Sequence, residues 1–254
     1  MSYNKTQLNP IAAVDRIISH RDQWAHLHRF YFVIKLFRAQ DKPKILDFGC
    51  GSGEMFELFY RNRYNPTKYL GLDIRTSAIA KNKEKFASQI KSRDLDFKVA
   101  DLCSAEQVNA AVPIEDWDVI TCFEVIEHVG KDNTEKLLKN IKAQCSKDTM
   151  VLISTPNYDP KVGAAGNHVI DGVVGEWDHD ELNALLEKHF TIEKEFGTFA
   201  SIKDYKDTLT PAQNEVYDLV SQYYDVSMLS VFFAPMIDPK LARNTIRVLK
   251  LKGE

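Results

Sequence analysis

The chain has 254 residues, of which 44% are hydrophobic and 27% charged, and its formal net charge at pH 7 is −3. This length is enough for a single domain with a full hydrophobic core. The small negative charge argues against a broad basic surface for nucleic acid, and no run approaches the roughly 20 apolar residues of a membrane span. Four scattered cysteines and a polar N-terminus indicate free thiols and no cleaved signal, so we expect a cytoplasmic protein.

The predicted elements begin with helices in residues 10–40, after a polar tail in residues 1–10. From residue 44 to 196, short apolar strands alternate with helical patterns, which predicts an α/β fold with a doubly wound, mostly parallel sheet. The predicted strands are 44–47, 69–74, 97–102, 117–124 and 150–157, and the predicted helices are 54–60, 76–91, 133–145 and 182–189.

The C-terminal part is predicted to hold a strand at 190–196 and a last strand at 243–251, separated by a long connection. This connection, residues 201–242, contains a predicted helix at 211–224 and an apolar stretch at 228–237. Because long connections are usually functional, we expect it to cover the substrate side together with the N-terminal helices. Its aromatic residues have two open readings, as core or as a stacking surface for a planar acceptor.

Three alternating glycines, Gly49, Gly51 and Gly53, follow the first predicted strand and precede a helix that starts at Glu54. Such a turn lets a ligand approach the backbone closely. A dinucleotide fold requires Gly-x-Gly-x-x-Gly, and the third of those positions is Glu54, whose carboxylate would repel a pyrophosphate. The acid at Asp47 instead suits a ligand that carries an ammonium group.

Acidic residues also end the next two predicted strands. Asp73 lies about twenty residues after the glycine turn, where a carboxylate can accept the hydroxyls of a ribose. Asp101 ends the third strand. Taken singly, each acid is better explained as a helix N-cap. Together they indicate a binding site along the carboxyl edge of a parallel sheet.

This order of motifs resembles the class I S-adenosylmethionine (SAM)-dependent methyltransferases over residues 43–200. The resemblance implies a seven-stranded Rossmann-like sheet with an antiparallel last strand, one methyltransferase domain over residues 1–254, and SAM as the cofactor. It implies that the methionine part of SAM is held by the glycine turn, the ribose by Asp73 and the adenine by Asp101 and Leu102. The full predicted cofactor set is Asp47, Gly49, Gly51, Gly53, Asp73, Ile74, Asp101, Leu102, Phe123 and Glu124.

The predicted catalytic residues follow the fourth strand. If a helical turn begins there, Glu124, Glu127 and His128 lie on one face and can bind a divalent ion. This Glu-x-x-Glu-His pattern resembles the metal-binding motif of Hen1-type small-RNA 2′-O-methyltransferases and is similar to that of ubiquinone-biosynthesis O-methyltransferases. The resemblance implies a further histidine ligand. We expect His168 first and His179 second, although His168 lies eight residues before Glu176, farther from the Glu-Trp pair than in the RNA family.

Two other interpretations of this motif stay open: His128 acts as a base without a metal, or the motif is purely structural. The sequence predicts a SAM-dependent methyltransferase with an oxygen acceptor, expected to be a small molecule, assisted by Mg²⁺ or Mn²⁺. The alternatives are 2′-O-methylation of an RNA terminus and a catalytically inactive SAM-fold binding protein. The acceptor itself and the oligomeric state are not predicted, because acceptor sites are built from variable loops.

Overall fold

The computed structural model describes residues 21–38, 42–161, 163–164, 168–170, 172–200 and 205–253. The expected polar tail and the part of the predicted N-terminal helices before residue 21 lie outside these residues. A helix, α2 (Arg21–Arg38), confirms the helical pattern for the remaining part. No helix in the described ranges combines the length and apolar character needed to cross a membrane.

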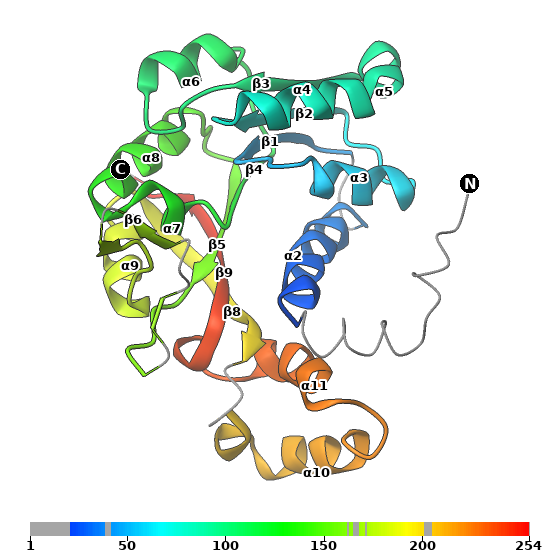
Figure 1. Ribbon diagram of the computed structural model, residues 1–254, viewed down its shortest axis with the longest axis vertical. Coiled ribbons are helices and arrows are strands. Elements are labelled where there is room, and N and C mark those ends of the chain that lie inside the picture. The colour runs from blue at the N-terminus through cyan, green and yellow to red at the C-terminus, as the bar shows by residue number, and fades with distance from the viewer. Residues whose placement is uncertain are drawn as a thin grey trace. The chain divides into compact units, whose positions relative to one another are not determined.

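The centre of the fold is a seven-stranded sheet in the order β3-β2-β1-β4-β5-β9-β8 (Figure 1). The first five strands pair in parallel, whereas the last strand runs antiparallel, which confirms the predicted doubly wound sheet. The strands are β1 (Lys44–Phe48), β2 (Lys68–Asp73), β3 (Asp94–Val99), β4 (Val119–Phe123), β5 (Met150–Pro156), β8 (Phe190–Ala200) and β9 (Ala242–Leu251).

The strand order reverses between β1 and β4. From β1 the chain proceeds outward through β2 and β3 and then returns to pair β4 on the other side, with Ile45 opposite Val119. In open parallel sheets, ligands bind at the carboxyl ends of the strands beside such a reversal. The residues that follow β1 and β4 therefore occupy the favoured ligand position.

The helices that connect these strands are α3 (Glu54–Arg61), α4 (Thr76–Lys85), α5 (Ala87–Ser92), α6 (Ala105–Ala111), α7 (Ile126–Val129), α8 (Lys131–Ala143) and α9 (His179–Leu186). The predicted helix 76–91 is interrupted at Phe86, which is 3% exposed. The ring of Phe86 lies 5.0 Å from that of Phe56 and 5.6 Å from that of Phe97. The interruption therefore places an aromatic ring in the core.

The third strand differs from its predicted range. It covers Asp94–Val99 rather than residues 97–102, so Asp101 lies beyond its end. There the carboxylate of Asp101 accepts a hydrogen bond of 2.9 Å from the amide of Cys103. An aspartate that accepts from the backbone amide two residues on forms an Asx turn, and this turn places Asp101 in the loop at the carboxyl edge.

The described residues form two compact units. The larger one comprises residues 30–195 and 246–253 and holds a continuous apolar core that includes Phe48, Trp117 and Ile120. The smaller one comprises residues 21–29 and 196–245. The prediction of one domain with a substrate-side cover stays a prediction.

The smaller unit contains two helices from the predicted insert, α10 (Pro211–Val220) and α11 (Val226–Phe233), and three short 3₁₀ turns at Tyr205–Thr208, Ala234–Met236 and Pro239–Leu241. Thr210 and Gln213 form a capping box at the start of α10. Tyr205 and Phe233 are buried in the core of this unit, whereas Tyr223 and Tyr224 are exposed. Tyr205 and Phe233 are therefore core residues and Tyr217 packs against both, whereas Tyr223 and Tyr224 are not part of this core.

Candidate functional site

The glycine turn after β1 is tied to the end of β2. The amides of Gly49 and Cys50 donate to the carbonyl of Leu72 at 2.8 and 2.9 Å. Gly49 has φ +89°, and an added Cβ would lie 2.2 Å from a methyl group of Val125. A side chain at this position would therefore clash with the loop after β4, so the turn requires glycine.

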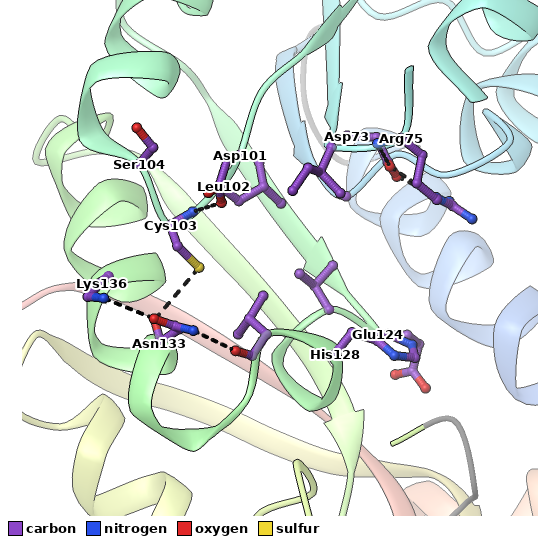
Figure 2. A pocket seen from close by; sticks show the side chains of 14 residues that line it. Asp73, Arg75, Asp101, Leu102, Cys103, Ser104, Glu124, His128, Asn133 and Lys136 are labelled. Carbon is purple, nitrogen blue, oxygen red and sulfur yellow. Dashed lines mark hydrogen bonds and ion pairs between the residues drawn. The ribbon is translucent and has the colours of Figure 1, made fainter. Parts of the chain in front are cut away.

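A cavity of about 650 Å³ lies at the carboxyl ends of the strands (Figure 2). Its walls come from the ends of β1, β2, β3 and β4 and from α7 and α8. Among the residues predicted from sequence, those that line it are Gly49, Asp73, Ile74, Asp101, Leu102, Glu124 and His128. Its other lining residues are Arg75, Cys103, Ser104, Val125, Val129, Asn133 and Lys136.

Asp47 is predicted to hold the ammonium group of SAM, but it does not line this cavity. It is 4% exposed, and its carboxylate accepts hydrogen bonds from Tyr69 at 2.5 Å and Thr121 at 2.8 Å. Burial raises the pKa of this carboxyl to about 6, although both hydroxyl donors lower it. Asp47 of β1 is thus hydrogen-bonded to residues of β2 and β4. Its contact with SAM stays a prediction.

Three other members of the predicted cofactor set, Gly51, Gly53 and Phe123, also lie outside the cavity lining. The amide of Gly51 donates to Oδ2 of the cavity residue Asp73 at 2.9 Å. Gly53 is the N-cap of α3. Phe123 ends β4 with its ring 6.5 Å from that of Phe30. Their contacts with SAM stay predictions.

Asp73 is held in place by four hydrogen bonds. The amides of Gly51 and Arg75 donate to it at 2.9 and 2.8 Å, and the Arg75 guanidinium donates at 3.0 and 3.2 Å. Burial alone would raise the pKa of Asp73, but the bonds from Arg75 outweigh burial and lower it. Asp73 is therefore a carboxylate at neutral pH, as acceptance of two ribose hydroxyls requires.

The expectation that Glu124 belongs to a helical turn with Glu127 and His128 is wrong. Glu124 has φ +55°, a left-handed conformation that is uncommon outside glycine, and α7 begins only at Ile126. Its amide donates to the carbonyl of Ser154 at 2.9 Å, and its Oε1 accepts from the Ser154 hydroxyl at 2.9 Å. Glu124 thus lines the cavity as part of a strained loop held by β5.

Glu127 and His128 of α7 meet His168 from a distant part of the chain. One potential ligand atom from each of the three lies within 4.8 Å of the other two. Glu127 is 0% exposed, and the Thr155 hydroxyl of β5 donates to its Oε2 at 2.9 Å. His128 also lines the large cavity, so the two features share a residue. Glu124 is not part of this group of three.

The irregular spacing of His168 is explained by a small hairpin of β6 (Val169–Ile170) and β7 (Val173–Val174). The amide of Gly175 closes it by donating to the His168 carbonyl at 2.7 Å. The hairpin returns the chain so that Glu176 contacts His168. His179, the second candidate, instead contacts Asp180 and Glu195 at 3.0 and 3.2 Å and is not in the group.

The sequence reading missed four residues around the site: Arg75, Lys136, Thr155 and Glu176. Arg75 follows the strand-end acid by two residues, a spacing that could have suggested an ion pair. Thr155 belongs to the Ser-Thr-Pro-Asn run and Glu176 to the Glu-Trp pair. Their partners, Glu127 and His168, are distant in the sequence and are brought next to them only by the fold.

A reversed parallel sheet, a glycine turn and strand-end acids around one cavity define a Rossmann-like, SAM-dependent methyltransferase. A family model described as a methyltransferase domain matches residues 19–213. The chain belongs to this family.

The chain is similar to two groups of O-methyltransferases. The chain is 30% identical to the small RNA 2′-O-methyltransferase of Rattus norvegicus over 137 residues, which are 52% of this chain and 34% of the relative. It is 29% identical to the ubiquinone biosynthesis O-methyltransferase of Rickettsia felis over 229 residues, which are 84% of this chain and 88% of the relative. The match to the Arabidopsis thaliana small RNA 2′-O-methyltransferase, at 26% identity, spans 52% of this chain and 14% of that protein. The chain thus matches about a third or less of these small-RNA enzymes.

Solved structures share the fold. The methyltransferase domain of a bacterial Hen1 protein aligns with a TM-score of 0.57 at 16% identity, over 89% of this chain and 100% of that one. A TehB-like SAM-dependent methyltransferase from Corynebacterium glutamicum aligns with a TM-score of 0.54 at 17% identity, over 94% of this chain and 99% of that one.

Proposed function

We propose that the protein transfers the methyl group of SAM to the hydroxyl of a small molecule and that a divalent ion at Glu127, His128 and His168 assists the transfer. One observation carries the proposal: His128 belongs to the candidate ion-binding group and also lines the large cavity. A hydroxyl held at this group is therefore adjacent to the space in which SAM is expected. In-line displacement at the sulfonium carbon needs this adjacency.

The three residues fit a divalent ion. Their potential ligand atoms converge from two segments, and a carboxylate with two imidazoles is a common donor set for divalent transition metals. Mg²⁺ prefers oxygen ligands, so the two imidazole nitrogens favour Mn²⁺ or a similar ion. The chemistry that such an ion supplies when bound is to lower the pKa of a nearby hydroxyl.

The chain's own residues orient the reaction. Thr155 holds the buried carboxylate of Glu127, and the α7 backbone presents His128 to the cavity. Asp73, at the end of β2, and Asp101, in the loop after β3, supply acceptors for the ribose hydroxyls and the adenine amino group. Cofactor and acceptor are thus aligned by residues from different strands that share one sheet edge.

A small acceptor is supported by the extent of the matches. The ubiquinone-type relative from Rickettsia felis matches 84% of this chain, whereas the small-RNA relatives match 52%. The net charge of −3 also favours an acceptor without a phosphate backbone. Methylation of an RNA terminus is the second candidate. It is favoured by the names of the small-RNA relatives and by the two histidines in the candidate ion-binding group.

Calorimetry with SAM and Mn²⁺ tests the proposal, using wild type and the double variant Glu127→Ala/His128→Ala. We expect wild type to bind both ligands and the variant to keep SAM binding but lose Mn²⁺ binding. Glu135 and His189, which lie 3.0 Å apart and do not line the cavity, provide the matched control Glu135→Ala/His189→Ala. Binding of SAM without Mn²⁺ by wild type would reject the ion and leave His128 as a candidate base.

Methyl transfer is then measured with labelled SAM on catechols, vicinal diols and short RNA oligonucleotides. We expect label on a small hydroxyl compound that depends on Mn²⁺ and is lost in the site variant but not in the control. Label only on the RNA 3′ end would favour the second candidate. Failure of wild type to bind SAM would support an inactive SAM-fold protein.

A further inference from the structure

Glu176 is a buried carboxylate in direct contact with a candidate ion ligand. It is 0% exposed, and its Oε1 lies 2.6 Å from His168 Nδ1. It is not a member of the group of three residues that could hold an ion. Its Oε1 thus contacts the imidazole of a residue that belongs to the group.

The backbone around Glu176 fixes the position of this carboxylate. Trp177 forms a parallel bridge with Asn157 at the end of β5, and the Tyr158 amide donates to the Trp177 carbonyl at 2.8 Å. The Trp177 indole donates to the hydroxyl of Thr134 at 3.2 Å. On the other side of Glu176, Gly175 packs so closely that an added Cβ would lie 2.1 Å from the Glu127 carbonyl oxygen. Glu176 is thus anchored to both β5 and α7.

This contact determines which nitrogen of His168 remains available. A carboxylate accepts a hydrogen bond, so it stabilises the tautomer with the proton on Nδ1. The lone pair is then on Nε2, which is the form that an ion needs. Histidine ligands in metal sites commonly donate their second N–H to a carboxylate, which orients the ring and makes it more basic.

We propose that Glu176 is a positioning residue that fixes the tautomer and ring orientation of His168, and that ion affinity depends on it. This inference rests on the proposed function, because it assumes that His168 binds an ion. It assigns a function in ion binding to a residue outside the ion-binding group, and so to the first residue of the Glu-Trp pair. The β6–β7 hairpin then places Glu176 next to His168, the ion ligand that it orients.

Two variants separate the charge of Glu176 from its hydrogen bond. Glu176→Gln keeps the shape and an oxygen acceptor but removes the charge, whereas Glu176→Leu removes both. The matched control is Glu135→Gln, because Glu135 Oε1 contacts His189 Nε2 at 3.0 Å in a carboxylate–histidine pair that is neither in the cavity lining nor in the ion-binding group. SAM affinity, measured on every variant, reports whether the fold is intact.

Two readouts are taken: the Mn²⁺ dissociation constant by calorimetry, and the histidine ring ¹⁵N chemical shifts without ion. We expect Glu176→Leu to weaken Mn²⁺ binding roughly 10- to 100-fold, as loss of an outer carboxylate does in other sites. The His168 ring should change from one tautomer to a mixture. Glu176→Gln should weaken Mn²⁺ binding less while keeping the tautomer, and Glu135→Gln should match wild type.

The inference is overturned if both Glu176 variants bind Mn²⁺ with wild-type affinity, or if His168 carries its proton on Nε2 in wild type. Absence of Mn²⁺ binding by wild type itself would instead reject the proposed function, and the inference with it. The two failures are thus distinguished by the wild-type titration.

Discussion

At the scale of single residues, the acids at the strand ends have different environments. Asp47 is buried with two hydroxyl donors, Asp73 forms an ion pair with Arg75, and Asp101 caps its own turn. All three were predicted at the ends of strands, but the residues that contact them cannot be identified from the spacing of the sequence. For Asp47 and Asp73, these contacts change the pKa of the carboxyl group in opposite directions from its ordinary value.

Arg75 is expected to compete with the ribose of SAM for Asp73. A carboxylate has about four acceptor positions, and on Asp73 two are used by backbone amides and two by the guanidinium. Two ribose hydroxyls must therefore displace the guanidinium, whose side chain is 60% exposed. Because an exposed ion pair contributes about 0.2–1 kcal/mol, Arg75→Met should tighten SAM binding roughly 1.4- to 5-fold by calorimetry.

The counterpart variant is Asp73→Asn, which keeps the size of the side chain but removes the charge, and should weaken SAM binding. A weaker SAM affinity of Arg75→Met than of wild type would show that Arg75 supports the cofactor instead of competing with it.

Asp47 should give the stability of the protein a distinct pH dependence. Its pKa is raised by burial from 3.8 to about 6, so between these values the folded state binds more protons than the unfolded state. The free energy of unfolding therefore falls as pH rises from about 4 to 6, and is constant with respect to this group above that range. At about 1.4 kcal/mol per pKa unit, the change is about 3 kcal/mol.

Urea denaturation of wild type and Asp47→Asn at several pH values measures this contribution, because the other groups titrate in both proteins. The stability of wild type relative to the variant should decrease between pH 4 and 6 and then level off. A difference that does not vary with pH would contradict a raised pKa for Asp47.

At the scale of elements, the candidate ion site depends on the contact between α7 and the β6–β7 hairpin. Gly175 lies at this contact, and an added Cβ would be 2.1 Å from the carbonyl oxygen of Glu127. A backbone atom cannot rotate away as a flexible side chain can, so the hairpin must shift. His168 would shift with it, because its carbonyl accepts the Gly175 amide.

We therefore expect Gly175→Ala to weaken Mn²⁺ binding at least 10-fold while SAM affinity stays near that of wild type. The control is Gly172→Ala in the same hairpin, where no atom lies within 4 Å of an added Cβ but φ is +79°. It introduces backbone strain of order 1 kcal/mol without the clash. Equal ion affinities for the two variants would contradict the role of the α7 contact.

At the scale of the whole molecule, the sequence predicted most of the sheet, because apolar runs followed by acids or glycines mark buried parallel strands. It did not predict the β6–β7 hairpin, whose strands have two residues each and carry no periodicity. It also misassigned Glu124 to a helix, because a left-handed φ in a non-glycine residue is imposed by its surroundings, here β5. The role of Glu176 could not be predicted, because its contact with His168 depends on the β6–β7 hairpin between them.

The most direct test of the account is a crystal structure of the protein with Mn²⁺ and S-adenosylhomocysteine, with data collected for the anomalous signal of manganese. We predict one strong anomalous peak within about 2.0–2.3 Å of ligand atoms of Glu127, His128 and His168. The ribose of the product should bind Asp73 in the adjoining cavity, with its sulfur facing His128. A bound product without a manganese peak at these residues, or with the peak elsewhere, would contradict the proposed ion-assisted transfer.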